Sequence, residues 1–242
     1  MDYNDVIAKR KSRRTYIETP IEKSKLEYLS MLAEKFNSEA NLRITIIEDA
    51  SNAFNGVSKS YGLFKGVRTI IALIGKKDDE NRKEKLGFYG ELLVLEATNL
   101  GLGTCWVGGT FDRGSNFVTL DEDELLECVI TVGDVPEVTF KERLIHKLAA
   151  PKSKLIEEFY KSDSPIPTWI YEGLKAVQKA PSAVNRQPVT FTYSENELRA
   201  SVENKQRFEL IDLGIAKAHF HVATKCRFDW GNGAQIYNDR QE

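Results

Sequence analysis

The stretch GELLVLEATNL, residues 90–100, followed by GLG at 101–103, decides how the rest of the chain is interpreted. Read as a helix, it carries apolar residues on more than one side, in the stripes Phe88-Leu92-Leu95 and Leu93-Ala97-Leu100. A helix that is apolar all round is buried, so we expect this one at the centre of the fold. Gly101 and Gly103 are typical of the turn that ends a helix. Residues 104–109 then read as a turn or short strand.

Apolar patterns on both sides of this central helix predict the other elements. Leu42, Ile44 and Ile46 alternate with polar residues, which indicates a half-buried strand. Residues 67–74 and 128–133 are apolar enough for strands in the middle of a sheet. The charged run 76–85 is interpreted as a solvated loop or helix end, and the polar tail from Gly231 as loosely held. Further elements are expected as helices over residues 2–10, 19–36 (capped by Thr19), 121–127, 169–179 and 211–225, and as a strand over 189–193.

Residues 162–167, SDSPIP, form the clearest linker, because Ser, Asp and Pro resist packing. We therefore expect a first half over residues 1–161 and a shorter second half over 168–242. A weak internal echo is consistent with two related halves. GELLVLEAT at 90–98 and GIAKAHFHVAT at 214–224 both begin with Gly and reach Ala-Thr, but their register drifts by two residues. Short helical matches also arise by chance, so this pattern leaves both explanations open.

The composition is that of an ordinary soluble enzyme. With 242 residues, 41% of them hydrophobic, the chain can bury a proper core. A net charge of −2 argues against a general nucleic-acid binder, and no apolar run of about eighteen residues predicts a membrane span. The acidic start MDYND is unlike a signal peptide, and the three cysteines are widely spaced without a CxxC pair. These features favour a reduced, cytoplasmic compartment.

Two short segments carry most of the information about function. The first, RKSRRTY at 10–16, gathers four cations and the hydroxyls of Ser12 and Thr15, which suits a doubly charged phosphate. The second, APSAVNRQP at 180–188, is a turn of small polar residues closed by prolines. It can bring backbone N–H groups, a Ser hydroxyl and an Asn amide against a flat heterocycle. Together the segments predict a phosphorylated, planar cofactor held from two distant parts of the chain.

With these segments, the chain resembles the FMN-dependent nitroreductases. Arg10, Ser12, Arg14 and Tyr16 fit the R-x-S-x-R-x-[FY] motif of that family, and GLGTCWVGG at 101–109 fits its glycine-rich turn. The family's P-S-x-x-N-x-Q-P motif stands at 181–188, at the far end of the chain, whereas in ordinary members it follows soon after the first motif. This order resembles a branch typified by a protein of a thermophilic bacterium, in which one chain holds both halves of a pseudo-dimer.

The resemblance implies an α+β fold, with a mixed, mainly antiparallel sheet and helices on both sides. Ordinary members are homodimers in which each flavin touches both chains. A late second motif is understandable if one chain here supplies both halves and one flavin site. Such a chain is complete as a monomer, but relatives also pair, so monomer and homodimer both stay open.

The resemblance also implies site residues by position. The phosphate and ribityl chain of FMN are expected on Arg10, Lys11, Ser12 and Arg14, with the late basic pair Lys152 and Lys154. Backbone near the flavin N5 is expected from Val107, Gly108 and Gly109, and the ring edge is expected along Pro181, Ser182, Ala183, Asn185 and Gln187. Many relatives carry Glu where Gly108 stands. The absence of that side chain here leaves the substrate side of the ring more open. No side chain is assigned a catalytic role, because the cofactor carries the chemistry.

The activity implied is an NAD(P)H-dependent flavin oxidoreductase. NAD(P)H would reduce FMN and leave, and an electron-poor small molecule such as a nitroaromatic or a quinone would replace it in a ping-pong cycle. No Rossmann or phosphate-loop motif for a nicotinamide is present, which agrees with a visiting cofactor. The alternatives are a non-catalytic flavin sensor or carrier and a flavin-free interaction module. A hydrophobic core does not require a turn of the kind seen at 181–188. The presence of this turn therefore argues against the flavin-free interaction module.

Two other patterns are interpreted as structural. His219 and His221 lie two residues apart on a predicted helix and point to different faces, so no metal ion shared with Cys226 is expected. Cys105 has no histidine beside it in the sequence, which disfavours a catalytic thiolate.

Overall fold

The computed structural model of the chain describes residues 3–54, 63–137, 153–204 and 208–238. The chain divides into two compact units. Unit 1 consists of Met1–Ala8, Lys83–Leu92 and Ala150–Glu242, and unit 2 of Lys9–Arg82 and Leu93–Ala149. The segment 162–167 lies inside unit 1, so this division differs from the one expected at the linker.

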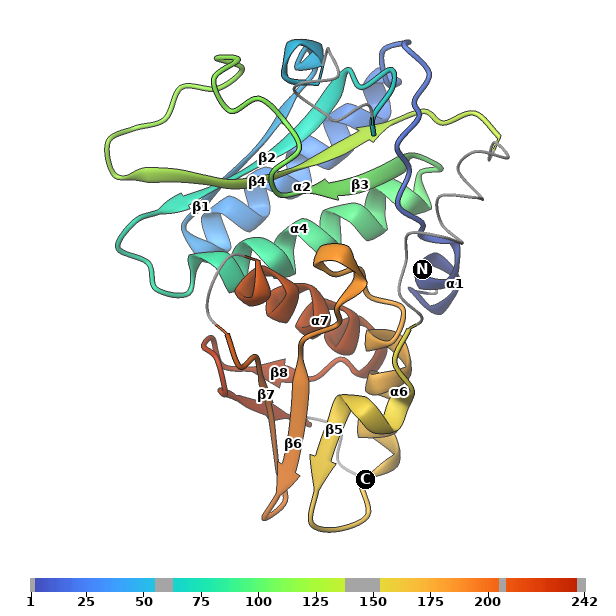
Figure 1. Cartoon of the computed structure of the whole chain (residues 1–242), viewed down its shortest axis with the longest axis vertical. Coiled ribbons are helices and arrows are strands. Elements are labelled where there is room, and N and C mark those ends of the chain that lie inside the picture. The colour runs from blue at the N-terminus through green and yellow to red at the C-terminus, as the bar shows by residue number, and fades with distance from the viewer. Residues whose placement is uncertain (1–2, 55–62, 138–152, 205–207, 239–242) are drawn as a thin grey trace. The chain divides into compact units, whose positions relative to one another are not determined.

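Unit 2 contains a four-stranded antiparallel sheet in the order β1-β2-β4-β3 (Figure 1). Its strands are β1 (Leu42–Ile47), β2 (Thr69–Lys76), β3 (Gly103–Val107) and β4 (Glu124–Gly133). Strand β2 lies between β1 and β4 and is buried over nearly its whole length, as its apolar run predicts. Helix α2 (Lys23–Ala40) contacts β1. The Asn37 side chain joins helix and strand by accepting from the Ile44 N–H at 2.6 Å and donating to the Ile44 carbonyl at 2.9 Å.

Unit 1 contains a five-stranded sheet in the order β5-β6-β7-β9-β8. Strand β5 is parallel to β6, and the other neighbours are antiparallel. Helices α6 (Thr168–Val177) and α7 (Glu209–Thr224) pack together, and the core around them includes Phe159, Phe191 and Phe220. The strands are β5 (Tyr160–Ser162), β6 (Thr190–Ser194), β7 (Glu197–Ser201), β8 (Arg227–Phe228) and β9 (Gln235–Tyr237). The remaining elements are helix α1 (Tyr3–Lys9) and the 3-10 turns η1 (Ser51–Ala53), η2 (Ile156–Phe159) and η3 (Ala183–Asn185).

The same succession of elements occurs twice along the chain. Helix α2, strands β1 and β2, helix α4 (Arg82–Asn99), and strands β3 and β4 form the first series. Helix α6, strands β6 and β7, helix α7, and strands β8 and β9 form the second series. The spatial orders are β1-β2-β4-β3 and β6-β7-β9-β8, so each strand of the first series has a counterpart at the same place in the second. This correspondence supports the expectation of two related halves, which stays a prediction.

Helices α4 and α7 approach closely within unit 1, where residues 83–92 of α4 lie. A Cβ atom added at Gly87 would collide with the backbone of Ile211, and one added at Gly214 would collide with the backbone of Glu84. Each glycine therefore faces the residue three positions before the other, as in a crossing with local two-fold symmetry. The absence of both side chains lets the two backbones touch.

The predicted fold class is confirmed as α+β with mainly antiparallel pairing, although the strands form two sheets and not one. The helix over 211–225 and the strands near 42–46, 67–74, 128–133 and 189–193 are present within about four residues of their predicted bounds, and the central helix is present but begins eight residues earlier than predicted, at Arg82. Among the described helices, none is both long and apolar enough to cross a bilayer.

Two predicted elements are wrong in part because tertiary contacts override local signals. Helix α2 begins at Lys23, not at Thr19, and Ile21 is buried before it. The expected helix over 121–127 is instead the start of β4, where Glu124 pairs with Arg43 at 3.0 Å and Leu126 aligns with Ile74. These long-range partners lie on strands that local pattern does not connect.

The polar tail is more ordered than expected, and the charged run, which contains a helix end as one of its two interpretations predicts, is less solvated than expected. Helix α4 begins at Arg82, inside the charged run, and Glu84 is buried rather than solvated. The tail from Gly231 includes β9, which pairs with both β7 and β8. The Gly231 N–H donates to Glu84 at 2.8 Å, so the same buried carboxylate explains both differences.

Candidate functional site

The basic segment 10–16 is an extended strip in unit 2. Ser12 bridges Thr104 of β3 in parallel fashion, and the Arg13 N–H donates to the Thr104 carbonyl at 2.8 Å. The segment then pairs with Lys65, which donates to Arg14 and accepts from Tyr16, each at 2.9 Å. The segment is therefore bonded on both sides and is not a solvated helix end.

Extended backbone explains the spacing of the R-x-S-x-R motif. Alternate residues of an extended chain point to the same side, so Arg10, Ser12 and Arg14 share one side. All three act on the Cys105 thiol in the middle of β3: burial raises its pKa, whereas Arg14, a hydrogen bond with Ser12, and Arg10 lower it. The three predicted phosphate residues therefore converge on one strand.

Arg13 and Tyr16 fasten the strip to the protein. The Arg13 guanidinium donates to the Pro136 carbonyl at 2.7 Å. The Tyr16 hydroxyl donates to the Arg13 carbonyl at 2.6 Å and is 2.7 Å from the Thr131 hydroxyl. Tyr16 is buried, and burial raises its pKa well above the ordinary value. The aromatic position of the motif is therefore an anchor in the core.

The end of β3 presents the residues expected near the flavin N5. Val107 is buried, and Gly108 and Gly109 follow it at the surface. The Gly108 carbonyl accepts from Arg113 at 3.1 Å. No atom lies within 4 Å of a Cβ atom built on Gly109, so the approach to its backbone is open. From Thr104 to Val107 the strand advances by about 10 Å, so the residues expected at the phosphate and those expected at the ring lie at different ends of it.

Cys105 is a core residue and not an activated thiol. It is 5% exposed, and burial is the largest influence on its pKa, which is raised. A thiol in that state is mostly protonated near neutral pH and is a poor nucleophile.

The second segment, 180–188, forms a strained turn in unit 1. Val184, Asn185 and Gln187 have positive φ angles of 48°, 54° and 48°, although none is glycine. A β-branched residue such as Val184 rarely adopts this region. Strain of this kind persists only where surrounding contacts enforce it.

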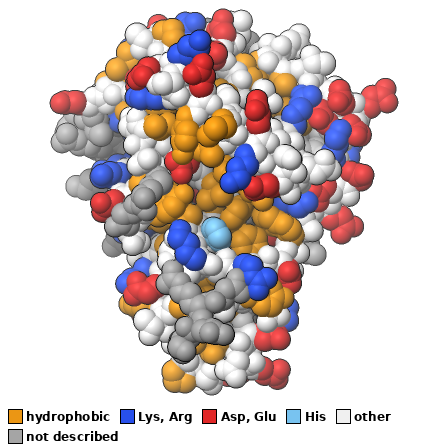
Figure 2. Space-filling view, turned by 180° about the vertical axis from the view of Figure 1, so that it is seen from behind, with side chains coloured by type: hydrophobic (Ala, Val, Ile, Leu, Met, Phe, Trp, Pro, Cys, Tyr) orange, Lys and Arg blue, Asp and Glu red, His pale blue; other side chains and the backbone are white. Residues whose placement is uncertain are grey.

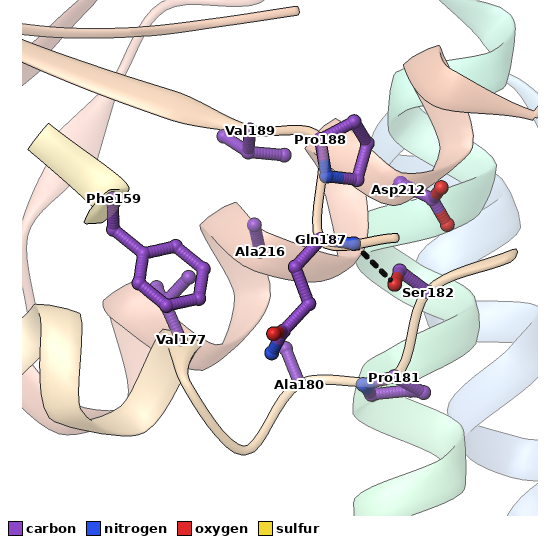
Figure 3. Close-up of a pocket in the computed structure, with 10 residues that line it drawn as sticks. All are labelled: Phe159, Val177, Ala180, Pro181, Ser182, Gln187, Pro188, Val189, Asp212 and Ala216. Atoms are coloured by element: carbon purple, nitrogen blue, oxygen red, sulfur yellow. Dashed lines mark hydrogen bonds between the residues drawn. The ribbon is translucent and has the colours of Figure 1, made fainter. Parts of the chain in front are cut away.

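Hydrogen bonds within unit 1 close the C-terminal end of this turn. The Gln187 N–H donates to the Ser182 hydroxyl at 2.8 Å, drawn as the dashed line in Figure 3. The Gln187 side chain accepts from the Lys154 N–H at 2.9 Å and donates to the Gln178 carbonyl at 3.0 Å. The Lys154 ammonium donates to the Gln187 carbonyl at 2.8 Å, and the Gln178 amide to the Lys154 carbonyl at 2.9 Å.

These contacts give two predicted cofactor residues partners inside the protein. Gln187 is only 4% exposed, and both ends of its amide are bonded to backbone. Lys154 is joined to the same turn rather than to the basic strip. Lys152 lies outside the described residues. The other members of this set, Pro181, Ser182, Ala183 and Asn185, are partly exposed along the turn.

Asp212 is the site residue that sequence reasoning missed. It lies in the first turn of α7, is 4% exposed, and accepts from the Ala183 N–H through both carboxylate oxygens, at 3.0 and 3.3 Å. Burial raises its pKa to about 7; Glu209 also raises it, whereas the Ala183 bond and Arg186 lower it. An acid in the first turn of a helix is common, so no sequence signal distinguishes this one.

A small cavity lies behind the turn. Its lining includes Ser182, Gln187, Asp212 and Ala216 (Figure 3). Its volume of about 10 Å³ is close to the room that one water molecule needs. The cavity itself cannot hold a flavin ring, so any ring at this segment must lie against the outer face of the turn.

Buried polar pairs account for the histidines and the central lysine of α7. Lys217 is 2.5 Å from Glu84 and also donates to the carbonyls of Asp229 and Gly231. Burial lowers the Lys217 pKa, and Glu84 opposes that change. Other contacts are His219 with Glu91 at 2.9 Å and with the Ala176 carbonyl at 3.0 Å, and His221 with the Cys226 carbonyl at 2.7 Å. The two histidines therefore have separate partners.

The described surface residues visible in Figure 2 include side chains of both charges. Figure 2 shows lysine and arginine side chains interspersed with acidic ones, and a histidine set among hydrophobic side chains. In unit 1, His221 belongs to an aromatic cluster with Phe88, Phe228 and Trp230, whose ring centroids are 5.0 to 6.4 Å apart where they pair. Edge-on packing of this kind is ordinary core chemistry.

The residues expected around FMN therefore form two clusters, one in each unit. Unit 2 holds Arg10, Lys11, Ser12, Arg14, Val107, Gly108 and Gly109, and unit 1 holds Lys154, Pro181, Ser182, Ala183, Asn185 and Gln187. The unit 2 cluster fits a phosphorylated group, because two guanidinium groups and a hydroxyl share one side of a strip beside an open glycine backbone.

Comparisons with known proteins show the family and the fold of the chain. A comparison with curated proteins gives no match. Among solved structures, a putative nitroreductase from Thermotoga maritima MSB8 is similar, with a TM-score of 0.66 and 22% identity over 98% of this chain and 92% of that one. At that identity the likeness shows the fold.

Two other structures match part of the chain. One is a nitroreductase family protein from Clostridium novyi NT, with TM-score 0.47 and 20% identity over 57% of this chain and 87% of that one. The other is a nitroreductase with bound FMN from Bacteroides fragilis NCTC 9343, with TM-score 0.46 and 15% identity over 58% of this chain and 91% of that one. No function is transferred from these weaker matches. The family model described as "Putative TM nitroreductase" matches residues 2–224. The chain belongs to this nitroreductase family, and its class is that of an oxidoreductase.

Proposed function

We propose that this protein is an FMN-dependent oxidoreductase of nitroreductase type, which passes electrons from NAD(P)H to an electron-poor small molecule. The family supports a redox function of this kind. The observation that carries the proposal is the convergence of Arg10, Ser12 and Arg14 on β3, whose far end leads to the open backbone of Gly109. A phosphate and a ring joined by a ribityl chain match that spacing.

The residues of unit 2 would bind and orient the cofactor. The guanidinium groups of Arg10 and Arg14 and the Ser12 hydroxyl donate to the phosphate, and Lys11 adds positive charge. Backbone from Val107 to Gly109 lies beside the ring near N5. When bound, FMN supplies the chemistry by taking a hydride from the nicotinamide and passing reducing equivalents to the acceptor.

The turn at 181–188 would complete the site along the ring edge. Pro181, Ser182, Ala183 and Asn185 are expected to offer backbone and side-chain contacts there. Gln187 and Lys154 support this role from behind, because their polar groups fix the turn. A missing glutamate at Gly108 leaves the other side of the ring open for nicotinamide and acceptor in alternation.

The absorption spectrum of the purified protein tests the first part of the proposal. Flavin bands, or their appearance after added FMN and removal of the excess, are expected at one FMN per chain. A colourless protein that takes up no FMN would favour an interaction module instead. Two FMN per chain would contradict a single site built from both segments, and light scattering on the same sample distinguishes monomer from homodimer.

Steady-state turnover tests the second part. NADH and NADPH oxidation should be rapid with menadione or a nitroaromatic acceptor and should follow ping-pong kinetics. A yellow protein with a full complement of FMN but no turnover with either nucleotide would favour a flavin sensor or carrier.

A further inference from the structure

The strained turn at 180–188 needs an anchor at each end. At its C-terminal end, Gln187 is fixed by Ser182, Lys154 and Gln178. These contacts hold one of the three residues with positive φ. Val184 and Asn185 precede that anchor, and their conformation depends on how the chain enters η3 at Ala183.

The entry to η3 is held from outside the turn. Asp212 projects from α7, and its two oxygens accept from the Ala183 N–H at 3.0 and 3.3 Å. Helix α7 is almost wholly buried and packs on α6, the helix that leads into the turn. The carboxylate is therefore attached to a rigid element, whereas the amide that it holds belongs to a strained one. A bond to a carboxylate is stronger than one between neutral groups.

We propose that Asp212 is a positioning residue for the flavin-ring segment: its carboxylate fixes the Ala183 amide and so holds the left-handed turn from Val184 to Gln187. The anchoring concerns contacts within unit 1, whereas its consequence for the ring rests on the proposed function. Asp212 is 4% exposed and faces the turn from behind, so it acts through Ala183 and is not a catalytic residue. The charged groups that act on it are Glu209 on α7 and Arg186 on the turn.

Two substitutions separate the hydrogen bond from the shape of the side chain. Asp212→Leu keeps the number and branching of the side-chain heavy atoms but removes the acceptor, and Asp212→Asn keeps a side-chain oxygen that can accept from Ala183. Glu209→Gln is the matched control, because it removes a carboxylate from the same turn of α7 without removing the bond to Ala183. Asp212→Ala replaces the leucine variant if that variant does not fold.

The first measurement needs no flavin. Hydrogen exchange at the Ala183 and Gln187 amides, followed by NMR in the full-length chain, should be about tenfold faster or more in Asp212→Leu, because the amide has lost its acceptor. Asp212→Asn and Glu209→Gln should stay within about threefold of the wild type. Unchanged exchange at Ala183 in both Asp212→Leu and Asp212→Ala would overturn the proposal.

The second measurement uses FMN itself. The dissociation constant should rise about tenfold in Asp212→Leu, and recover in Asp212→Asn. The visible circular dichroism of the saturated leucine variant should also differ from the wild type, because the ring lies against a displaced turn. Equal affinity and spectra in all variants would overturn the positioning role. If the wild type binds no FMN, the proposed function fails, while the exchange experiment still decides whether Asp212 fixes the turn.

Discussion

The two series of elements have the same strand order but differ in how the first helix joins the first strand. In the first series Asn41 alone connects α2 to β1, in a left-handed conformation with φ of 55°. In the second series residues 178–189 connect α6 to β6 and contain the strained turn. The strand order is therefore retained with a one-residue or a twelve-residue connection, so the strained turn is an addition to the scaffold that the strand order does not require.

The series differ again in the strip that precedes the first helix. Before α2 lies the basic strip bonded to β3, and before α6 lies β5, bonded to β6. Each series thus carries one of the two segments expected around FMN. The FMN stoichiometry named under the proposed function tests whether the two segments serve one flavin.

At the crossing of α4 and α7, the two glycines are related by the local two-fold symmetry, but the charged residues are not. Gly87 and Gly214 have equivalent places, and so have Glu84 and Ile211, each three residues earlier. When Gly87 is aligned with Gly214, Lys217 aligns with Gly90, Glu91 with Ala218 and His219 with Leu92. Each of these charged or basic residues thus has an uncharged counterpart. In the pairs Glu84–Lys217 and Glu91–His219, the acid therefore lies on α4 and the base on α7. If α4 packed against a second α4, Glu84 would be buried without Lys217, and if α7 packed against a second α7, Lys217 would be buried without Glu84. The buried ion pair therefore favours the pairing of α4 with α7 over a pairing of identical helices.

The largest expected effect comes from breaking this asymmetry. Lys217→Met should lower the free energy of unfolding by about 3–5 kcal/mol, because it leaves Glu84 buried without its cation. Glu84→Leu combined with Lys217→Met should recover a large part of that loss, since two apolar residues leave no buried charge. Urea denaturation measures both. A double variant less stable than the single one would show that Glu84 matters more through Gly231 than through Lys217.

The next effect concerns the second series only and depends on pH. The folded pKa of Asp212 is about 7 against an ordinary value of 3.8, so the folded state binds this proton more tightly. Its contribution to stability is therefore complete at low pH and is lost as pH rises towards 7. The unfolding free energy of Asp212→Asn minus that of the wild type should therefore increase by about 2–3 kcal/mol when the pH is raised from 5 to 8. A difference that does not vary with pH would contradict the titration of Asp212 in this range.

A smaller loss is expected from filling the glycine contact. Gly214→Ala should cost about 2 kcal/mol, because the new Cβ atom meets the backbone of Glu84 and the helices must separate. Gly87→Ala should cost a similar amount if the crossing is symmetric. Gly109→Ala, which meets no atom within 4 Å, is the control and should change stability by less than about 0.5 kcal/mol. Thermal unfolding measures these changes in stability. Unequal losses at the two glycines would show that the helix crossing is not symmetric.

The smallest expected effect tests the segment carried by the first series. Arg14→Ala should weaken FMN binding about tenfold, equivalent to about 1.4 kcal/mol, because one charge-assisted contact to phosphate is lost. Lys9→Ala removes a cation just before the strip and is expected to leave affinity nearly unchanged. Fluorescence titration with FMN measures both. Equal affinity in wild type and Arg14→Ala would remove Arg14 from the phosphate role.

Part of this molecule was determined by local sequence. The apolar run of β2, the all-round apolar helix α4 and the alternation at β1 gave the right elements, because burial of such patterns has few solutions. The motif residues Arg10, Ser12 and Arg14 were expected together, and extended backbone places them on one side of the strip. Family membership follows from the same residues and is shown by the match over residues 2–224.

The rest was decided by contacts between residues far apart in the chain. Asp212 looks like any acid in a first helical turn until Ala183 is brought to it, and Glu84 looks solvated until Lys217 and Gly231 surround it. Glu124 starts a strand because Arg43 and Lys76 lie beside it. A sequence encodes which side chains are charged or apolar, but burial and pairing, which set their pKa and their energy, arise only when distant segments meet.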